Sequence, residues 1–144
     1  CCQIYKTIIM RKIIYLFVIT FMILSCEKPA GEGGTSEING NVTYFTTSYN
    51  AQTSSLDTTY YPKSGKDIFI IYSDNENDLF DDKTETDWNG NFKFEYLRKG
   101  DYVVYTYVDS VVVNDVTYDS PVFYHVNISE NNSSIILEDY IIQN

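Results

Sequence analysis

TDWNGNFKFEYLRKGDYVV, residues 86–104, carries the clearest indication of the fold in this chain. Apolar and polar residues alternate over residues 91–96, which is the period of a strand with one buried face. Asn89-Gly90 is a preferred dipeptide for a type I′ hairpin turn, and Lys99-Gly100 allows a second tight turn. The stretch therefore predicts three consecutive strands joined by two turns.

The chain around this stretch also favours strands. After Glu37, no segment repeats apolar residues at helical spacing, and short β-rich runs alternate with turn residues. Residues 47–66 are polar, and we expect a long loop or irregular edge there. The pattern predicts an all-β fold, a single Greek-key-type β-sandwich of about seven or eight strands. The expected strands are residues 38–45, 67–72, one ending before Asn89, 91–96, 102–108, 111–116, 122–128 and 134–142.

The pattern TDxNGxFxFxxLxxGxYxV over residues 86–104 resembles the transthyretin-like sandwiches. That group includes the carboxypeptidase regulatory-like domains and the B-type repeats of bacterial collagen adhesins. IxGxV over residues 38–42 stands where this family opens its first strand. The resemblance implies an accessory or structural module rather than an enzyme. Adhesin repeats often carry an isopeptide bond from a first-strand lysine, but residues 37–45 hold no lysine, so we expect no such bond.

The beginning of the chain has the features of an export signal. Residues 13–24 are nearly all apolar and follow Arg11-Lys12. A membrane-spanning helix needs about 20 apolar residues, whereas a run of this length suits the h-region of a signal peptide. Met10 is the natural start of such a signal, so residues 1–9 are interpreted as an upstream extension of the reading frame.

The apolar run ends in ILSC, residues 23–26, which resembles a bacterial lipobox. That resemblance implies a signal peptide over residues 1–25 and acylation of Cys26, which becomes the first residue of the mature chain. Two or three acyl chains on one residue anchor a protein firmly, because each buried CH₂ contributes about 0.8 kcal/mol. We therefore expect a protein of the bacterial cell envelope, lipid-anchored at the outer membrane. The side of that membrane on which it lies, periplasmic or surface, stays open.

Residues 26–36 are predicted to be the lipidated cysteine and a flexible tether, because they are rich in glycine and hold no large apolar side chain. The sandwich is expected over residues 37–144. The mature chain would keep one cysteine, which is acylated, so we expect no internal disulfide.

The charge of the chain excludes several classes of partner. Twenty acidic residues face 10 basic ones, and the net charge is −10. After cleavage before Cys26, 7 basic residues against 20 acidic ones give −13. Nucleic-acid binding needs a clustered basic face, and docking on anionic lipid needs a polybasic patch. We expect neither.

An acidic loop within residues 74–82 is the first candidate site. Alternating carboxylates suit Ca²⁺, which takes six to eight oxygen ligands. The flanks favour strands, and Leu79 stands where an EF-hand loop needs glycine, so an EF-hand is not expected. The alternative is a solvated loop that links two strands. The candidate metal ligands are Asp74, Glu76, Asp78, Asp81 and Asp82.

Tyr60, Tyr61 and Trp88 form the second candidate site, for a ligand such as a glycan or peptide. Tyrosine and tryptophan combine an apolar face with a polar edge, which suits exposed binding platforms. The alternative is that these rings cover the ends of the sandwich core.

The sequence carries no motif of an enzyme. His125 is the only histidine, and we expect a structural role for it on a strand. No G-x-S-x-G motif is present, and a structural zinc site would need several Cys or His ligands. Thr58 and Ser110 lie in short motifs that resemble the O-glycosylation acceptor of some Gram-negative anaerobes.

These observations favour an exported lipoprotein that acts as a non-catalytic binding or scaffolding module and needs no cofactor. A glycan or an envelope protein is the expected partner. Three alternatives stay open at this point: a calcium-binding accessory module, a small envelope hydrolase, and a subunit of a larger assembly completed by strand addition at an exposed edge.

Overall fold

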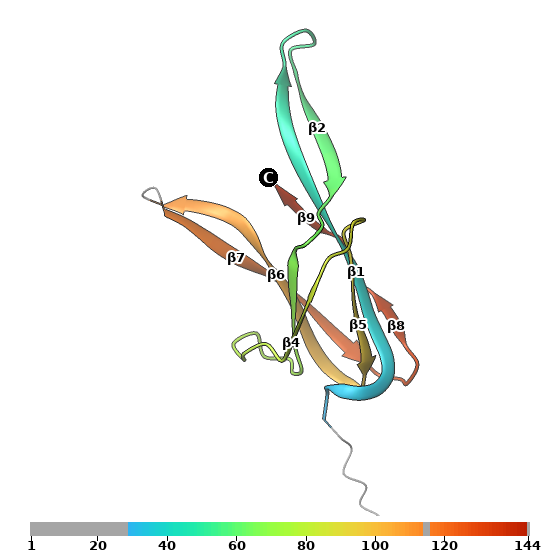
Figure 1. Cartoon of the computed structure of the whole chain (residues 1–144). Helices are drawn as coiled ribbons and strands as arrows, with labels where there is room; N and C mark the ends of the chain where they lie inside the picture. Colours follow the sequence, from blue (N-terminus) through green and yellow to red (C-terminus); the bar gives the residue numbers. More distant parts are fainter. Residues whose placement is uncertain (1–28, 114–115, 144) are drawn as a thin grey trace, which may run out of the picture.

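The computed structural model describes residues 29–113 and 116–143, and this part of the chain is all-β. Its nine strands form two packed sheets, which confirms the β-sandwich predicted from the sequence. Figure 1 shows two long hairpins, β1–β2 and β6–β7, extending in different directions from the sandwich. The strands are β1 (Glu32–Asn50), β2 (Ser55–Pro62), β3 (Asp67–Ile71), β4 (Asp82–Glu85), β5 (Asn91–Leu97), β6 (Gly100–Val113), β7 (Val116–Ile128), β8 (Ser134–Ile136) and β9 (Tyr140–Gln143).

The first sheet is built on both sides of β1. On one side, the first half of β1 pairs antiparallel with β5 and its second half pairs antiparallel with β2. On the other side, the first half pairs parallel with β8 and the second half pairs parallel with β9. The second sheet has the order β4-β3-β6-β7 and is antiparallel throughout. A strand as long as β1 can serve four partners because its two halves lie beside different strands.

The core lies between the two sheets. Alternate residues of the facing strands point inward, as the period of two requires. The hydroxyl of Tyr140 in β9 donates to the carbonyl of Val104 in β6 at 2.9 Å, which joins the two sheets. The buried residues of this core are Ile38, Val42, Tyr44, Ile68, Ile70, Phe92, Phe94, Leu97, Tyr102, Val104, Val126, Ile128, Tyr140 and Ile142.

The β1–β2 hairpin occupies much of the segment where a long loop or irregular edge was expected. The loop was wrong, whereas β2 does lie at an edge of its sheet, as a regular strand. Asn50 pairs with Ser55 at its tip and Thr43 with Pro62 at its base. The outer part of the hairpin is exposed, so its side chains show no alternation of apolar and polar residues. Threonine and tyrosine favour strands, and cross-strand pairs stabilise them without a buried face.

The turn at Asn89-Gly90 joins two sheets rather than two strands of one hairpin. β4 pairs with β3, and β5 pairs with β1. Asn89 has a negative φ and Gly90 a φ of 78°, whereas a type I′ turn needs positive φ at both positions. The Asp87 carboxylate accepts from the backbone N–H groups of Asn89 and Asn91 at 2.8 and 2.9 Å and shapes this different turn.

Two further strand boundaries differ from the expectation. β6 continues to Val113 through a register shift between Asp109 and Val111, where we expected two strands. A bulge lets a strand bend without ending, and sequence alternation cannot reveal it. The expected strand over residues 134–142 is divided into β8 and β9, which pair with different halves of β1.

The first residues of β1 were expected to be part of the tether. Glu32 and Ser36 both pair with Leu97, with a bulge between them. A Cβ atom at Gly34 would overlap the Leu97 carbonyl, so glycine here permits close strand contact rather than flexibility. The predicted signal peptide and Cys26 lie outside the described residues. In residues 29–113 and 116–143, no helix is long and apolar enough to cross a membrane.

Candidate binding groove

Two of the three aromatic residues predicted to bind a ligand lie side by side on β2. Tyr60 is 62% exposed and packs against Phe45 of β1, with ring centroids 5.9 Å apart. Tyr61 is half-buried and packs against Tyr44 at the edge of the core, at 6.1 Å. Tyr61 therefore has the covering role that was the alternative, while Tyr60 presents its ring to solvent.

Two adjoining hollows form a groove on the first sheet, with volumes of about 590 and 440 Å³. Asn41 and Asp139 line both hollows, so they stand where the two meet. The larger hollow extends over β1 and β5 toward β4, and the smaller one extends to Tyr60 and Tyr61. We call this surface the β1 groove. It brings together residues from five strands and two connections.

The amide of Asn41 is held in place at the middle of the β1 groove. Its Nδ2 donates to the backbone carbonyl of Asn89 at 2.9 Å and to Oδ1 of Asn91 at 3.0 Å. Its Oδ1 accepts from the hydroxyl of Thr43 at 3.0 Å. Such preorganised polar groups cost less entropy on binding than free side chains do.

Lys93 is the one cation among the described residues that line the larger hollow, and its charge is compensated. The Lys93 ammonium lies 2.7 Å from Glu37 and 2.7 Å from Glu95. Lys93, together with the hydrogen bonds from Ser134 and Asn39, lowers the pKa of Glu37 from 4.5 to about 2. The same pair of glutamates raises the pKa of Lys93. A lysine with two carboxylate partners is poorly suited to bind an anionic ligand.

Asp87 supplies an ionised carboxylate to the groove. The backbone N–H groups of Asn91 and Asn89 lower its pKa, so it accepts hydrogen bonds and does not act as an acid near neutral pH. Glu85 and Asp139 line the groove with it. The groove thus presents amides, hydroxyls, carboxylates and one exposed tyrosine ring, which is a set that suits a neutral ligand rich in hydroxyl groups.

Trp88 stands in the sequence between Asp87 and Asn89, two residues that line the β1 groove, but its own side chain does not line the groove. It is 88% exposed at the turn between β4 and β5. The structure therefore joins Tyr60 and Tyr61 in one site and leaves Trp88 at its margin.

The acidic loop folds back on the second sheet, and its carboxylates have separate partners. Asp78 accepts from Ser73 and from Asn75, both at 2.7 Å. Asp81 accepts from the backbone N–H of Tyr72 at 2.7 Å. Among the described residues, no group of three or more His, Cys, Asp or Glu side chains could hold a metal ion. Calcium binding by Asp74, Glu76, Asp78, Asp81 and Asp82 stays a prediction.

His125 lies on β7 and contacts the acidic loop. Its Nε2 lies 2.8 Å from a carboxylate oxygen of Glu76, and both side chains are about half exposed. The imidazole therefore lies against a carboxylate that holds the loop to the sheet, not against a serine or cysteine. The structural role of His125 stays a prediction.

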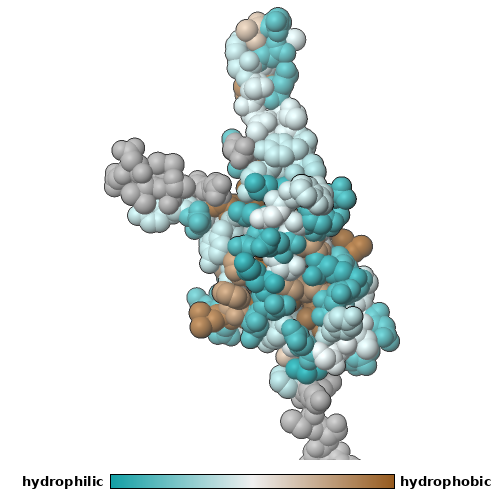
Figure 2. Space-filling model, viewed as in Figure 1, coloured by the Kyte–Doolittle hydropathy of each residue, from teal (hydrophilic) through white to brown (hydrophobic). Residues whose placement is uncertain are grey.

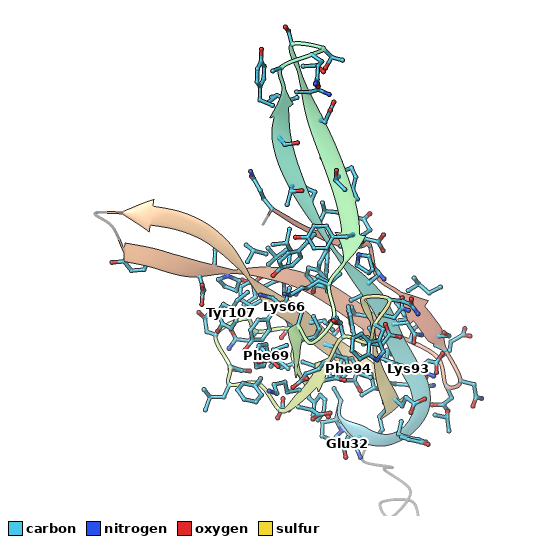
Figure 3. The ribbon with its side chains drawn as sticks, turned by 45° about the horizontal axis from the view of Figure 1, so that its top comes forward. Glu32, Lys66, Phe69, Lys93, Phe94 and Tyr107 are labelled. Atoms are coloured by element: carbon cyan, nitrogen blue, oxygen red, sulfur yellow. The ribbon has the colours of Figure 1, made fainter. Side chains whose placement is uncertain are left out.

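An aromatic cluster on the outer face of the second sheet was missed in the sequence. Phe69 lies at its centre, with ring centroids of Phe80, Tyr105 and Tyr107 at 5.0, 5.1 and 5.8 Å. Figure 3 shows Phe69, Tyr107 and Lys66 near one another, where a hollow of about 310 Å³ lies. The sequence did contain a signal for this cluster. The two strands expected to be central, residues 67–72 and 102–108, carry aromatic residues at positions that point away from the main core. The pairing of β3 with β6 brings Phe69 beside Tyr105 and Tyr107, and the loop before β4 adds Phe80.

The exposed apolar residues do not form one large docking surface in the view of Figure 2. Hydrophilic residues cover most of that face, and hydrophobic residues form small, separate patches. Large contiguous apolar patches would mark a protein interface.

The predicted glycosylation sites are far apart in the fold. Thr58 is exposed on β2 and pairs with Thr47. Ser110 lies in β6, where the register shifts, and its side chain lies outside the described set. Modification of either residue stays a prediction.

Comparisons with known proteins add little to this description. No family model matches the chain, and no curated protein matches it. A solved structure that resembles it is that of a Pseudomonas aeruginosa protein proposed to bind carbohydrate. The identity is 13%, the match covers 80% of this chain and 92% of that protein, and the TM-score is 0.43. A likeness of this size carries no argument about function, and the transthyretin-like resemblance stays a prediction.

Proposed function

We propose that this protein is an exported, lipid-anchored envelope module that binds a neutral glycan in the β1 groove and carries out no reaction. The observation that carries the proposal is the position of Tyr60 at one end of a groove whose central amide, Asn41, is fixed by three hydrogen bonds. A sugar ring can stack on the tyrosine while its hydroxyls bond with the amides and carboxylates.

The charge of the protein supports a neutral ligand. The mature chain is expected to carry −13, and Lys93 is engaged by Glu37 and Glu95. An acidic polysaccharide or a phosphate would meet repulsion here, because a field of one sign disfavours ligands of the same sign. Neutral hexose polymers meet no such cost.

The anchoring part of the proposal rests on the lipobox-like ILSC at residues 23–26. Acylation of Cys26 would keep the module at the envelope, where glycans are abundant. In cells, the Cys26→Ala variant is expected to leave the membrane fraction and accumulate as an unprocessed or released form. Processing and retention equal to the wild type would contradict the anchoring.

Affinity electrophoresis through gels that contain a glucan, a mannan or a xylan tests the ligand. We expect retardation by at least one of these neutral polymers. Tyr60→Ala should weaken it by about tenfold or more, which corresponds to ~1.4 kcal/mol. Tyr49→Ala is the matched control, because Tyr49 is equally exposed on the same hairpin but does not line the groove. Equal mobility with and without every polymer, or equal loss in both variants, would contradict the proposal.

A second candidate is a subunit that is completed by strand addition. Among the residues that the structure describes, β2 pairs with β1 alone, so its other edge is open there along residues 55–62. Open strand edges are templates for pairing with another chain. The Lys63 N–H donates to the Val42 carbonyl, so in this register the N–H groups of odd-numbered β2 residues face β1 and those of even-numbered residues face the open edge. A Thr58→Pro substitution would therefore remove a backbone donor from the open edge of β2. If the protein assembles, the substitution should weaken its co-purification with a partner while glycan retardation persists.

A further inference from the structure

The folded body of this protein begins much closer to the predicted acylation site than the sequence suggested. The carbonyl of Pro29 accepts from Nε of Arg98 at 2.9 Å, and the carbonyl of Gly31 accepts from the backbone N–H of Arg98 at 2.8 Å. The N–H of Gly31 donates to the hydroxyl of Tyr102 at 2.9 Å. We call residues 29–31 the N-terminal strap.

Packing also holds the strap. Ala30 packs against the buried core cluster and lies beside Gly100. A Cβ atom at Gly100 would come within 2.7 Å of the Ala30 side chain, so this contact needs glycine. Gly31 is buried. The strap therefore belongs to the sandwich and is not free chain.

Three residue steps separate Cys26 from Pro29. A fully extended chain covers at most about 3.6 Å per residue, so the two positions lie within about 11 Å of each other whatever the conformation between them. The 11-residue tether expected from the sequence would have allowed about 40 Å by the same measure. The difference decides whether the module can tumble freely above a bilayer.

We infer that the sandwich is held directly against the lipid surface by its strap end, with the β1–β2 hairpin pointing away from the membrane. The inference rests on the proposed acylation of Cys26. The connection from Cys26 to Pro29 is the leash of the module. Because a headgroup layer is several ångströms thick, a leash of about 11 Å keeps the strap end next to the headgroups and prevents free rotation of the module above them. The partner of this end is therefore the lipid headgroups.

The membrane-facing end is formed by the strap, the β5–β6 connection and the β7–β8 loop. Asn132 donates its N–H to Thr35 at 3.1 Å, which places that loop beside the start of β1. Lys99 is exposed in the β5–β6 connection, so a cation is available to lipid phosphates at this end, whereas the neighbouring Arg98 holds the strap. The hairpin tip at residues 50–55 lies at the opposite end of the molecule (Figure 1).

Short-range fluorescence quenching tests the orientation. Single cysteines replace Asn131 in the β7–β8 loop or Gln52 at the hairpin tip, and each carries a fluorophore on the acylated, full mature chain. The protein is reconstituted in phosphatidylcholine vesicles that contain a headgroup nitroxide lipid. We expect strong quenching at position 131 and none at position 52. Equal quenching at both positions would overturn the inference.

A length variant provides the matched control. An insertion of ten residues, all glycine or serine, between Lys28 and Pro29 should abolish the quenching at position 131 without changing the melting temperature. Unchanged quenching would show that something other than the leash holds the module, and would overturn the inference.

Flotation distinguishes the two ways in which the idea can fail. Wild-type protein should float with the vesicles, and Cys26→Ala should not. If neither floats, the anchoring and the orientation both fail. If wild type floats but positions 131 and 52 are quenched alike, the anchoring stands and the orientation alone fails.

Discussion

The hydroxyl of Tyr102 accepts a hydrogen bond from the backbone N–H of Gly31 at 2.9 Å, across 71 residues of sequence. The same hydroxyl donates to the carbonyl of Arg98 at 2.7 Å. Tyr102 is fully buried, and desolvation raises the pKa of its phenol, so the group stays protonated and able to donate. One side chain thus fastens the N-terminal strap to the turn that opens β6.

Tyr102→Phe should lower the free energy of unfolding by about 1 to 3 kcal/mol, because it leaves the buried Gly31 N–H without a partner. Chemical denaturation measures the change. Tyr49→Phe is the control, since the hydroxyl of Tyr49 belongs to an exposed side chain, and it should change little. In the Tyr102→Phe variant, a protease should also cut the N-terminal strap near Pro29 faster than in the wild type. A variant as stable as the wild type would contradict this role.

Gly40→Ala should destabilise the core by about 1 to 3 kcal/mol, the usual range for added volume in a packed interior. The ring of Phe92 occupies the space that a Cβ at Gly40 would need. Phe92→Leu replaces that ring with a smaller side chain, so the double variant Gly40→Ala/Phe92→Leu should be more stable than the sum of the two single changes predicts. Additive losses in thermal melts would show that the ring and the new methyl group do not compete.

The Glu37–Lys93 pair should make the stability depend on pH in acid. The pKa of Glu37 is about 2 in the folded protein and 4.5 ordinarily, so the unfolded chain takes up the proton first as the pH falls. The pair's contribution is fully present above about pH 4.5 and is lost as the pH falls toward about 2. Urea midpoints of wild type should therefore fall more steeply over that range than those of Glu37→Gln.

The control for this pH effect is Glu138→Gln, since Glu138 is exposed and forms no ion pair among the described residues. This variant should keep the wild-type slope. Parallel slopes for wild type and Glu37→Gln would argue against the ion pair.

Calcium binding by the acidic loop predicts a melting temperature that is higher in millimolar Ca²⁺ than in chelator, with the rise abolished by Asp78→Ala. Because Asp78 also accepts from Ser73 and Asn75, the variant's own melting temperature in chelator must serve as its reference. Asp57→Ala, an acid on β2, should keep the rise. Identical melts of the wild type in the two buffers would end the calcium hypothesis.

Part of the candidate site could be predicted from the sequence. Tyr60 and Tyr61 were recognisable because aromatic residues next to turn or loop residues often form binding platforms. Both line the β1 groove, Tyr60 with an exposed ring and Tyr61 half-buried against the core. Asn41 was not recognisable as a site residue. Its role depends on Asn89 and Asn91, which are about 50 residues away and reach it only because β1 pairs with β5.

Local sequence patterns were sufficient to predict most of the strands and the apolar residues that form the core. Alternation such as that of residues 91–96 is a local property of the backbone, in which successive side chains point to opposite faces. Tertiary structure decided what lies beside what. The turn at Asn89-Gly90 could not show that it crosses between sheets, because the partner of each strand is chosen by burial over the whole molecule. For the same reason, the glycines at 31–34 could be interpreted as a tether, although close contact with Leu97 and Tyr102 makes them part of the fold.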